Sequence, residues 1–289
     1  MFEGFSQRQV LIRNVRINIR IGGDGPPLLL LHGYPQTHAA WHKIAPALAE
    51  RFTVVCSDLR GYGGSDRPRS DPEHRSYSKR AMAEDQVAVM RSLGFMQFAV
   101  AGHDRGARVG HRMALDHADS VTRLAVLDVV PTLHAWEHMD RQVAMADFHW
   151  LFLAQPDDLP EMLIGSTPGK YLEWILSHWN ATPGAIPQHL LSEYRRGFDA
   201  GMIHASCEDY RASATIDLKH DRADLERKLQ CPVLALWSES GTGAMFDVLA
   251  AWRERATDVR GRALDCGHFL PEERPDEVIL ELRKFLSEG

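Results

Sequence analysis

Two kinds of residue pattern alternate along most of the chain. Between Val10 and Ile21 apolar and polar residues alternate, which predicts exposed antiparallel strands. Continuous apolar runs predict buried strands at 27–31, 52–56, 98–101, 124–127 and 233–237. Apolar residues at helical spacing predict helices over 39–50, 79–93, 107–117 and 275–286. Because buried strands alternate with helices, we predict an α/β fold with a mostly parallel sheet and helices on both faces.

The region from residue 132 to residue 214 departs from this alternation. It contains no apolar run typical of a buried strand, it is rich in His, Trp, Met and Leu, and prolines interrupt it repeatedly. We interpret this region as a helical cap inserted into the sheet domain. The predicted domains are therefore a core of residues 1–131 and 215–289 and a cap of residues 132–214.

Composition and charge narrow the class of protein. A chain of 289 residues with 44% hydrophobic residues can bury a large core, and a net charge of -6 argues against a nucleic-acid partner. The four cysteines lie far apart without CxxC spacing, which favours reduced thiols over a disulfide framework or a zinc site. Because there is no signal-peptide pattern and no apolar run approaching ~20 residues, we expect a soluble cytoplasmic protein that does not enter a membrane.

The most informative motif is Gly102-His103-Asp104-Arg105-Gly106. It stands between a predicted strand and a predicted helix, where Gly-x-nucleophile-x-Gly forms a sharp turn that exposes the middle side chain. The middle residue is Asp104, and a carboxylate there can displace a leaving group from carbon and form an alkyl ester. The motif therefore favours dehalogenation or epoxide opening over acyl transfer. The alternative is an ordinary turn in which glycines flank an aspartate.

Two further residues complete a catalytic set. His268 lies in a Gly-His turn before the last predicted helix, and it suits the base because the elbow nucleophile is followed along the chain by the acid and then the histidine. Asp128 and Glu239 each follow a predicted buried strand, so both are candidates for the acid that orients the imidazole. We favour Asp128, because the shorter side chain at a strand end is better placed.

Two arginines follow the nucleophile. Arg105 and Arg108 are three residues apart at the start of the predicted helix, so they lie on neighbouring surface at a helix end that already favours anions. Guanidinium groups bind carboxylates through paired hydrogen bonds, which predicts a substrate with a carboxylate next to the reacting carbon. We interpret Arg112 as a solvated surface arginine. No ligand cluster or phosphate-binding glycine loop predicts a metal or an organic cofactor.

These residues belong to a wider similarity. Together with the segments 1–5, 58–65, 110–117, 148–150 and 209–212, they resemble the fluoroacetate (haloacetate) dehalogenases of the α/β-hydrolase fold. The resemblance implies that His149, Trp150 and Tyr210 bind the departing halide through N–H and O–H donors. It also implies a homodimer that hydrolyses a small 2-haloacid with water and without a cofactor, giving glycolate from fluoroacetate.

The loop His32-Gly33-Tyr34-Pro35 is expected to face the elbow. In related folds the backbone N–H groups of that loop and of the residue after the nucleophile form the oxyanion hole, which assigns this role to Tyr34 and Arg105. The dehalogenases commonly carry Phe where this chain has Tyr34. The backbone role is unaffected by that change, and the added hydroxyl alters the pocket.

Two other functions stay open at this stage. An epoxide hydrolase also uses Asp, His and a cap, but it needs acidic O–H donors, commonly two cap tyrosines, and only Tyr210 clearly matches such a donor. A catalytically silent protein of the same fold could capture small acids. The complete set of Asp104, Asp128 and His268 argues against the silent protein.

Overall fold

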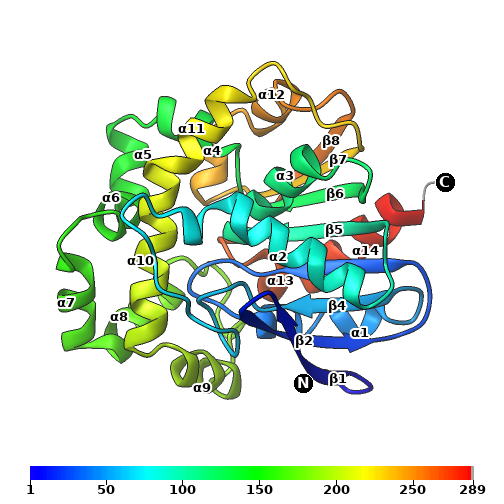
Figure 1. The fold of residues 1–289 in the computed structure, drawn as a ribbon, viewed down its shortest axis with the longest axis horizontal. Coiled ribbons are helices and arrows are strands. Elements are labelled where there is room, and N and C mark those ends of the chain that lie inside the picture. Colours follow the sequence, from blue (N-terminus) through cyan, green and yellow to red (C-terminus); the bar gives the residue numbers. More distant parts are fainter. Residues whose placement is uncertain (288–289) are drawn as a thin grey trace.

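The computed structural model describes residues 1–287 and is built around one eight-stranded sheet (Figure 1). The strand order is β1-β2-β4-β3-β5-β6-β7-β8, and β2 runs antiparallel to both of its neighbours while the remaining pairs are parallel. The predicted mostly parallel sheet is therefore confirmed. The strands are β1 (Ser6–Ile12), β2 (Val15–Gly22), β3 (Pro27–Leu31), β4 (Thr53–Ser57), β5 (Phe98–His103), β6 (Val121–Leu127), β7 (Val233–Ser238) and β8 (Val259–Leu264).

Alternate residues of the central strands are buried in two separate cores. Leu29 and Leu31 of β3 belong to one hydrophobic cluster, Leu28 and Leu30 belong to another, and all four side chains are fully buried. Since successive strand residues point to opposite faces, each cluster marks one face of the sheet. Burial on both faces explains why these strands are continuous apolar runs in the sequence.

Helices cover both faces of the sheet, as predicted (Figure 1). Helices α2 and α3 contribute Met90 and Val109 to the first cluster, while α1 and α14 contribute Leu48 and Leu282 to the second. Most of the apolar surface of the core is therefore removed from water on both sides. The helices are α1 (Ala45–Leu48), α2 (Lys79–Ser92), α3 (Arg105–Asp116), α11 (Ile216–Ala223), α12 (Val248–Arg253), α13 (Leu270–Glu273) and α14 (Pro275–Ser287), with short 3-10 helices at His38–Trp41, Arg75–Tyr77 and Thr242–Met245.

Residues 132–214, all of which the structure describes, contain helices and no strand. We call this part the helical segment. It stands to one side of the sheet, on the left of Figure 1. Its division from the rest of the chain as a separate cap domain stays a prediction. The helices are α4 (Thr132–Glu137), α5 (Arg141–Ala146), α6 (Phe148–Leu153), α7 (Leu159–Ser166), α8 (Pro168–His178), α9 (Gln188–Gly197) and α10 (Ala200–Ala214).

Three elements differ from the sequence-based expectation. The helix expected over 39–50 is broken into a 3-10 turn and the short α1, because Pro46 at the start of α1 has no N–H to continue the preceding turn. Strand β8 was not expected, since Arg260 and Arg262 interrupt its apolar pattern, as is typical of an edge strand. Of the N-terminal antiparallel pair only β1 is exposed, because Ile17 and Ile19 of β2 are fully buried.

No helix within residues 1–287 has the length and apolar character needed to cross a membrane.

Candidate active site

The sharp turn at Asp104 depends on its two flanking glycines. Asp104 has a φ of 46°, a conformation that few non-glycine residues adopt, and it immediately precedes α3. A Cβ on Gly102 would lie 2.5 Å from the Ala107 backbone nitrogen. A Cβ on Gly106 would meet the His32 carbonyl oxygen at 2.6 Å. Strand, turn and helix therefore approach more closely than any other residue allows, as expected for a nucleophile elbow.

The loop after β3 faces the Asp104 carboxylate. The Tyr34 N–H donates to Asp104 Oδ2 at 2.9 Å. A Cβ on Gly33 would lie 2.5 Å from the Asp104 Cβ, so only glycine leaves room there. The structure thus brings Tyr34 and Asp104 together, as the sequence predicts for the oxyanion loop. The Arg105 N–H is at the first position of α3, where helix N–H groups have no partner within the helix.

His268 is paired with Asp128 and not with Glu239. His268 Nδ1 lies 2.7 Å from Asp128 Oδ2, while Asp128 Oδ1 accepts the Ser238 N–H at 2.9 Å. Glu239 is exposed at the surface. The choice of Asp128 over Glu239 therefore agrees with the geometry. Since Asp128 holds Nδ1, the other ring nitrogen of His268, Nε2, is the one free to act, and no protein group bonds it.

The charges of this site shift the pKa values of His268 and Asp104. Burial opposes the charge on His268, but the Asp128 carboxylate and the nearby Asp104 outweigh it and raise the pKa of His268 to about 9. Burial likewise opposes the charge on Asp104, but His268 and Arg105 outweigh it and lower the pKa of that carboxyl. Asp104 is therefore kept ionised, which is the form that a nucleophile needs.

Arg105 is held by a carboxylate that the sequence analysis did not single out. Asp209 of α10 accepts from Arg105 Nε at 3.0 Å and from Nη2 at 2.6 Å, and it also accepts from Tyr62 Oη at 2.9 Å and from Lys79 Nζ. Both Arg105 and Asp209 are fully buried. Only Nη1 of the guanidinium is buried without a partner. Arg105 can therefore offer a substrate only its Nη1 NH₂ group, and not the two neighbouring nitrogens that would form the paired hydrogen bonds expected from the sequence.

Arg108 lies on the same side of α3 and lines the cavity next to Asp104. Its Nη1 donates to the Val130 carbonyl oxygen at 3.0 Å and to Thr132 Oγ1 at 3.2 Å, and its guanidinium carbon lies 4.4 Å from the centre of the Trp150 ring. Burial, with repulsion from Arg105, lowers the pKa of Arg108 to about 10, so it is still a cation at neutral pH. An anionic substrate would offset this repulsion.

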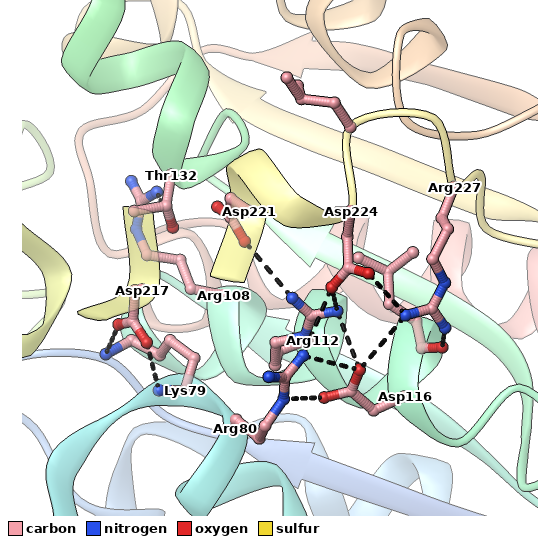
Figure 2. Close-up of polar contacts among 12 residues, drawn as sticks. Lys79, Arg80, Arg108, Arg112, Asp116, Thr132, Asp217, Asp221, Asp224 and Arg227 are labelled. Atoms are coloured by element: carbon pink, nitrogen blue, oxygen red, sulfur yellow. Dashed lines mark hydrogen bonds and ion pairs between the residues drawn. The ribbon is translucent and has the colours of Figure 1, made fainter. Parts of the chain in front are cut away.

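The interpretation of Arg112 as solvated is wrong. Its side chain is almost fully buried and forms ion pairs with Asp116 at 2.9 Å, Asp224 at 2.6 Å and Asp221 at 3.7 Å. Figure 2 shows how these groups join α2, α3 and α11, with Arg80 and Arg227 completing the network. Arg112 is structural because three carboxylates satisfy its charge away from the cavity.

His149, Trp150 and Tyr210 meet beside the elbow. Tyr210 and His149 have ring centroids 5.5 Å apart, and Tyr210 and Trp150 6.3 Å. Burial lowers the pKa of His149 to about 3, so its imidazole is neutral at pH 7. His149 Nδ1 and Tyr210 Oη are both buried without a protein partner. Polar atoms of this kind are costly to leave unpaired, which points to a polar ligand in this corner.

One cavity of about 350 Å³ contains most of the expected site residues. Tyr34, Arg105 and Tyr210 are not among the residues that line it. The helical segment supplies further lining residues that the sequence analysis missed, among them Asp147, Trp179 and Asn180. Asp147 and Trp179 carried no local signal, since a carboxylate before a helix and a tryptophan after one are ordinary features. The lining consists of Asp104, Arg108, Asp128, Ala146, Asp147, His149, Trp150, His178, Trp179, Asn180, Ala181, Ser240, Gly241, Met245, Gly267 and His268.

One group of possible metal ligands occurs among the side chains that the structure describes. Asp158, Glu161 and His204 lie close together on the helical segment, outside the cavity lining. Glu161 already accepts from Arg211 Nη1 at 2.7 Å and Nη2 at 2.8 Å, and it lies 3.0 Å from His204 Nδ1. An arginine that neutralises the central carboxylate disfavours a cation there, so the group is an ion-pair cluster.

This strand order, with an aspartate in a nucleophile elbow, is typical of the α/β hydrolases. Comparison with known proteins gives the same class. Residues 26–275 match the family model for the alpha/beta hydrolase fold. The chain is 49% identical to a fluoroacetate dehalogenase of Burkholderia sp over 100% of this chain and 96% of that protein. It is 35% identical to a soluble epoxide hydrolase of Corynebacterium sp. strain C12 over 98% of this chain and 97% of that protein.

Solved structures of relatives superpose closely on the chain. A protein from Nostoc sp PCC 7120, assigned to the α/β hydrolases, is 56% identical with a TM-score of 0.99 over 100% of both chains. A candidate epoxide hydrolase from Pseudomonas aeruginosa is 46% identical with a TM-score of 0.94 over 99% of this chain and 96% of that one. The chain belongs to the fluoroacetate dehalogenase family of the α/β-hydrolases. It is therefore a hydrolase, and the resemblance found in the sequence is confirmed.

Proposed function

We propose that the protein is a hydrolytic dehalogenase that cleaves the carbon–halogen bond of fluoroacetate and other small 2-haloacids. One arrangement carries this proposal: the Asp104 carboxylate shares a cavity with the His268–Asp128 pair and with the buried cation Arg108. The Burkholderia relative, named a fluoroacetate dehalogenase, supports the same reaction class. The products would be halide and a 2-hydroxy acid, glycolate in the case of fluoroacetate.

The first step forms an ester on Asp104. The substrate carboxylate binds Arg108 and the remaining Nη1–H of Arg105, which places the carbon that bears the halogen next to Asp104. An Asp104 oxygen bonds to that carbon from the side opposite the halogen, and the halide leaves with the electron pair of the broken bond. His149, Trp150 and Tyr210 donate N–H and O–H groups to the halide, which a poor leaving group such as fluoride requires.

The second step hydrolyses the ester. His268 Nε2 accepts a proton from water as the water oxygen attacks the Asp104 carboxyl carbon. The backbone N–H groups of Tyr34 and Arg105 stabilise the resulting oxyanion, and the alcohol leaves with the proton that His268 returns. Ester formation removes the Asp104 charge, one of the charges that raise the pKa of His268. The neutral imidazole is therefore favoured at the stage when a base is needed.

The test is halide release from fluoroacetate and chloroacetate by the purified protein, with Asp104→Asn as the control. Fluoride release that disappears in the variant supports both the reaction and the nucleophile. Chloride release without fluoride release would support the mechanism, but it would show that His149, Trp150 and Tyr210 do not stabilise fluoride as a leaving group. Stoichiometric binding of the acid without product would instead make the chain a silent acid-binding protein, and no halide with no binding refutes the proposal.

Epoxide hydrolysis is the second candidate function. The unpartnered His149 Nδ1 and Tyr210 Oη favour it, because an epoxide oxygen needs donors at that place when the ring opens. The Corynebacterium relative is named a soluble epoxide hydrolase. Incubation with a panel of small terminal epoxides separates the two functions: diol formation together with no halide from either haloacid would replace the dehalogenase proposal.

Two further expectations concern the whole protein. We propose that the helical segment is a cap over the active site, since it supplies His149, Trp150 and Trp179 to the cavity wall. We also propose a cytoplasmic homodimer, as the family resemblance implies. Light scattering coupled to size-exclusion chromatography tests the dimer, and a mass close to the 32.6 kDa of a single chain would contradict it.

A further inference from the structure

A buried carboxylate outside the cavity lining holds the backbone on both sides of His268. Glu273 of α13 accepts the Gly267 N–H through Oε2 at 2.9 Å and the Phe269 N–H through Oε1 at 3.0 Å. The Glu273 side chain is almost fully buried. Gly267 and Phe269 are the chain neighbours of His268, so one carboxylate fixes both peptide groups that set the position of the imidazole.

The same carboxylate joins the His268 loop to the helical segment. Glu273 Oε2 also accepts the Ala181 N–H at 3.0 Å, and the His268 N–H donates to the Trp179 carbonyl oxygen at 2.8 Å. The two backbones pass so closely that a Cβ on Gly267 would lie 2.6 Å from the Ala181 nitrogen. The hydrogen bonds of Glu273 therefore connect two stretches of chain that are far apart in the sequence.

Trp179 extends this connection into the cavity. Its ring centroid lies 5.3 Å from that of His268 and 4.5 Å from that of His149. Trp179 and His268 both line the cavity, and His268 Nε2 has no protein partner. A displacement of residues 179–181 or of the His268 loop would thus move the only free nitrogen of the proposed base relative to Asp104.

We propose that Glu273 is a positioning residue for the hydrolysis step, because it holds the N–H groups of Gly267, Phe269 and Ala181 and thereby keeps His268 Nε2 directed at the Asp104 ester. This inference rests on the proposed function, in which His268 is the base. The first step does not use His268 to move a proton. The second step does, so loss of the Glu273 contacts should affect the two steps unequally.

Glu273→Gln is the decisive variant. Its remaining oxygen can still accept two N–H groups, but the new NH₂ group replaces the acceptor for the third and places a donor against it. We expect steady-state chloride release from chloroacetate to fall about 10- to 100-fold, since misplacement of a base by about 1 Å has that effect. The chloride burst of the first turnover should keep the wild-type rate. Mass spectrometry should then detect the ester accumulated on Asp104.

Glu272→Gln is the matched control. Glu272 is the adjacent residue and is also buried, but its carboxylate bonds Gln36 and Tyr194 and not the His268 loop. Burial raises the pKa of Glu272 to about 8, so this carboxyl is already mostly neutral at pH 7 and the amide replaces it closely. We expect wild-type burst and steady-state rates. If Glu273→Gln does not fold, Gly267→Ala serves in its place, because the added methyl separates the same two backbones without removing a charge.

A second readout does not need turnover. In protein labelled with ¹⁵N-histidine, NMR follows the Nδ1 proton that His268 shares with Asp128 and the pKa of that imidazole. Glu273→Gln and Gly267→Ala should weaken or shift this resonance, while Glu272→Gln should leave it unchanged. If the wild type releases no halide, the proposed function fails and the NMR result alone decides on Glu273. An unchanged resonance, or an equal loss of burst and steady-state rates, overturns the positioning role.

Discussion

At the scale of single residues, the site is organised by the mutual effect of Asp104 and His268. The charge of each group favours the charged form of the other, so the protein holds the Asp104 carboxylate beside an imidazolium at neutral pH. That arrangement keeps Asp104 ionised although it is buried. In the proposed mechanism, esterification removes the Asp104 charge, which lowers the pKa of His268 and so increases the neutral form that can act as a base.

The first prediction concerns the pH dependence of turnover. The pKa of His268 is raised to about 9, so its neutral form increases as the pH rises towards that value. If ester hydrolysis limits turnover, steady-state halide release should rise with pH between about 6 and 9. The apparent pKa should lie below 9, since the ester lacks the Asp104 charge. A rate that is independent of pH over this interval, measured with chloroacetate, would contradict His268 as the base.

The second prediction concerns Arg108. Arg108→Lys should raise KM for chloroacetate about 10-fold, because an ammonium group cannot bond the Val130 carbonyl, Thr132 and a substrate carboxylate together. Arg91→Lys, at an exposed position of α2, is the control and should leave both kinetic constants unchanged. Initial-rate measurements on both variants give the answer. A KM unaffected by Arg108→Lys would remove this residue from substrate binding.

The residues of the site differ in how far the sequence revealed them. Asp104, Asp128 and His268 each stand in a recognisable local setting, a glycine-flanked turn or the end of an apolar strand. Asp209 and Glu273 act through contacts with Arg105 and Gly267, and nothing in their local sequence indicates those partners. The error at Arg112 has the same origin, because two of its three carboxylate partners, Asp221 of α11 and Asp224 just after that helix, are more than 100 residues away along the chain.

At the scale of elements, the junction of β5 and α3 leaves no room for side chains at its two glycines. Gly102 lies near the end of β5 and Gly106 lies in the first turn of α3. Both glycines face backbone atoms at distances that exclude a side chain. The elbow is thus shaped by close packing of main chain on main chain. Its strained Asp104 conformation is maintained by the surrounding sheet and helix.

The third prediction tests this junction. Gly102→Ala should lower the free energy of unfolding by about 1–3 kcal/mol, because backbone atoms 2.5 Å from the new Cβ must move. The shift would also displace Asp104, so halide release should fall even under conditions in which the variant remains folded. Gly165→Ala in α7 is the control: nothing lies within 4 Å of its added Cβ, and it should be neutral or slightly stabilising. Urea unfolding and halide release measure both effects, and equal stability of the two variants would refute this account.

Elements were predicted best where burial on both sides makes the pattern uniform. The strands β3 to β7 and the long helices α2, α3 and α14 were found because packing fixes their composition. Strand β8 was missed because its edge position permits Arg260 and Arg262, and a helix was overextended at Pro46. Tertiary position therefore decided those elements more than local preference did.

At the scale of the whole molecule, an ion-pair network links the segments on either side of the helical segment (Figure 2). Helix α11 follows the helical segment and carries Asp217 and Asp221, while Lys79 of α2 and Arg112 of α3 face them. Lys79 also contacts Asp209, the partner of Arg105. The network thus reaches from the outer surface of the core to the buried Arg105, the residue that follows Asp104 in the chain.

The fourth prediction concerns Asp221. Burial and the neighbouring Asp217 raise its pKa to about 6, above the ~3.9 of an unfolded chain. The contribution of this group to stability is therefore complete below about pH 4 and is lost as the pH rises through 6. Asp221→Asn is neutral at every pH, so it should stabilise the protein at pH 7.5 by about 1–2 kcal/mol and by much less at pH 4.5.

The control for that prediction is Asp116, whose pKa is shifted in the opposite direction. The pKa of Asp116 is lowered because Arg80 and Arg112 outweigh its burial, so the folded state favours its charge. Asp116→Asn should reduce stability at pH 7.5. Thermal unfolding of both variants at the two pH values tests the pair, and destabilisation by Asp221→Asn at pH 7.5 would show that its contact with Arg112 dominates.

The sources of the cavity wall have a practical consequence. Asp104, Asp128 and His268 come from loops at the ends of sheet strands, while His149, Trp150 and Trp179 come from the helical segment. Directed evolution can therefore treat the two sets as separate libraries. Under the proposed function, randomising the helical-segment positions would explore which leaving groups and acids are accepted while Asp104, Asp128 and His268 stay fixed. Swapping that segment between relatives would then be a route to new substrates.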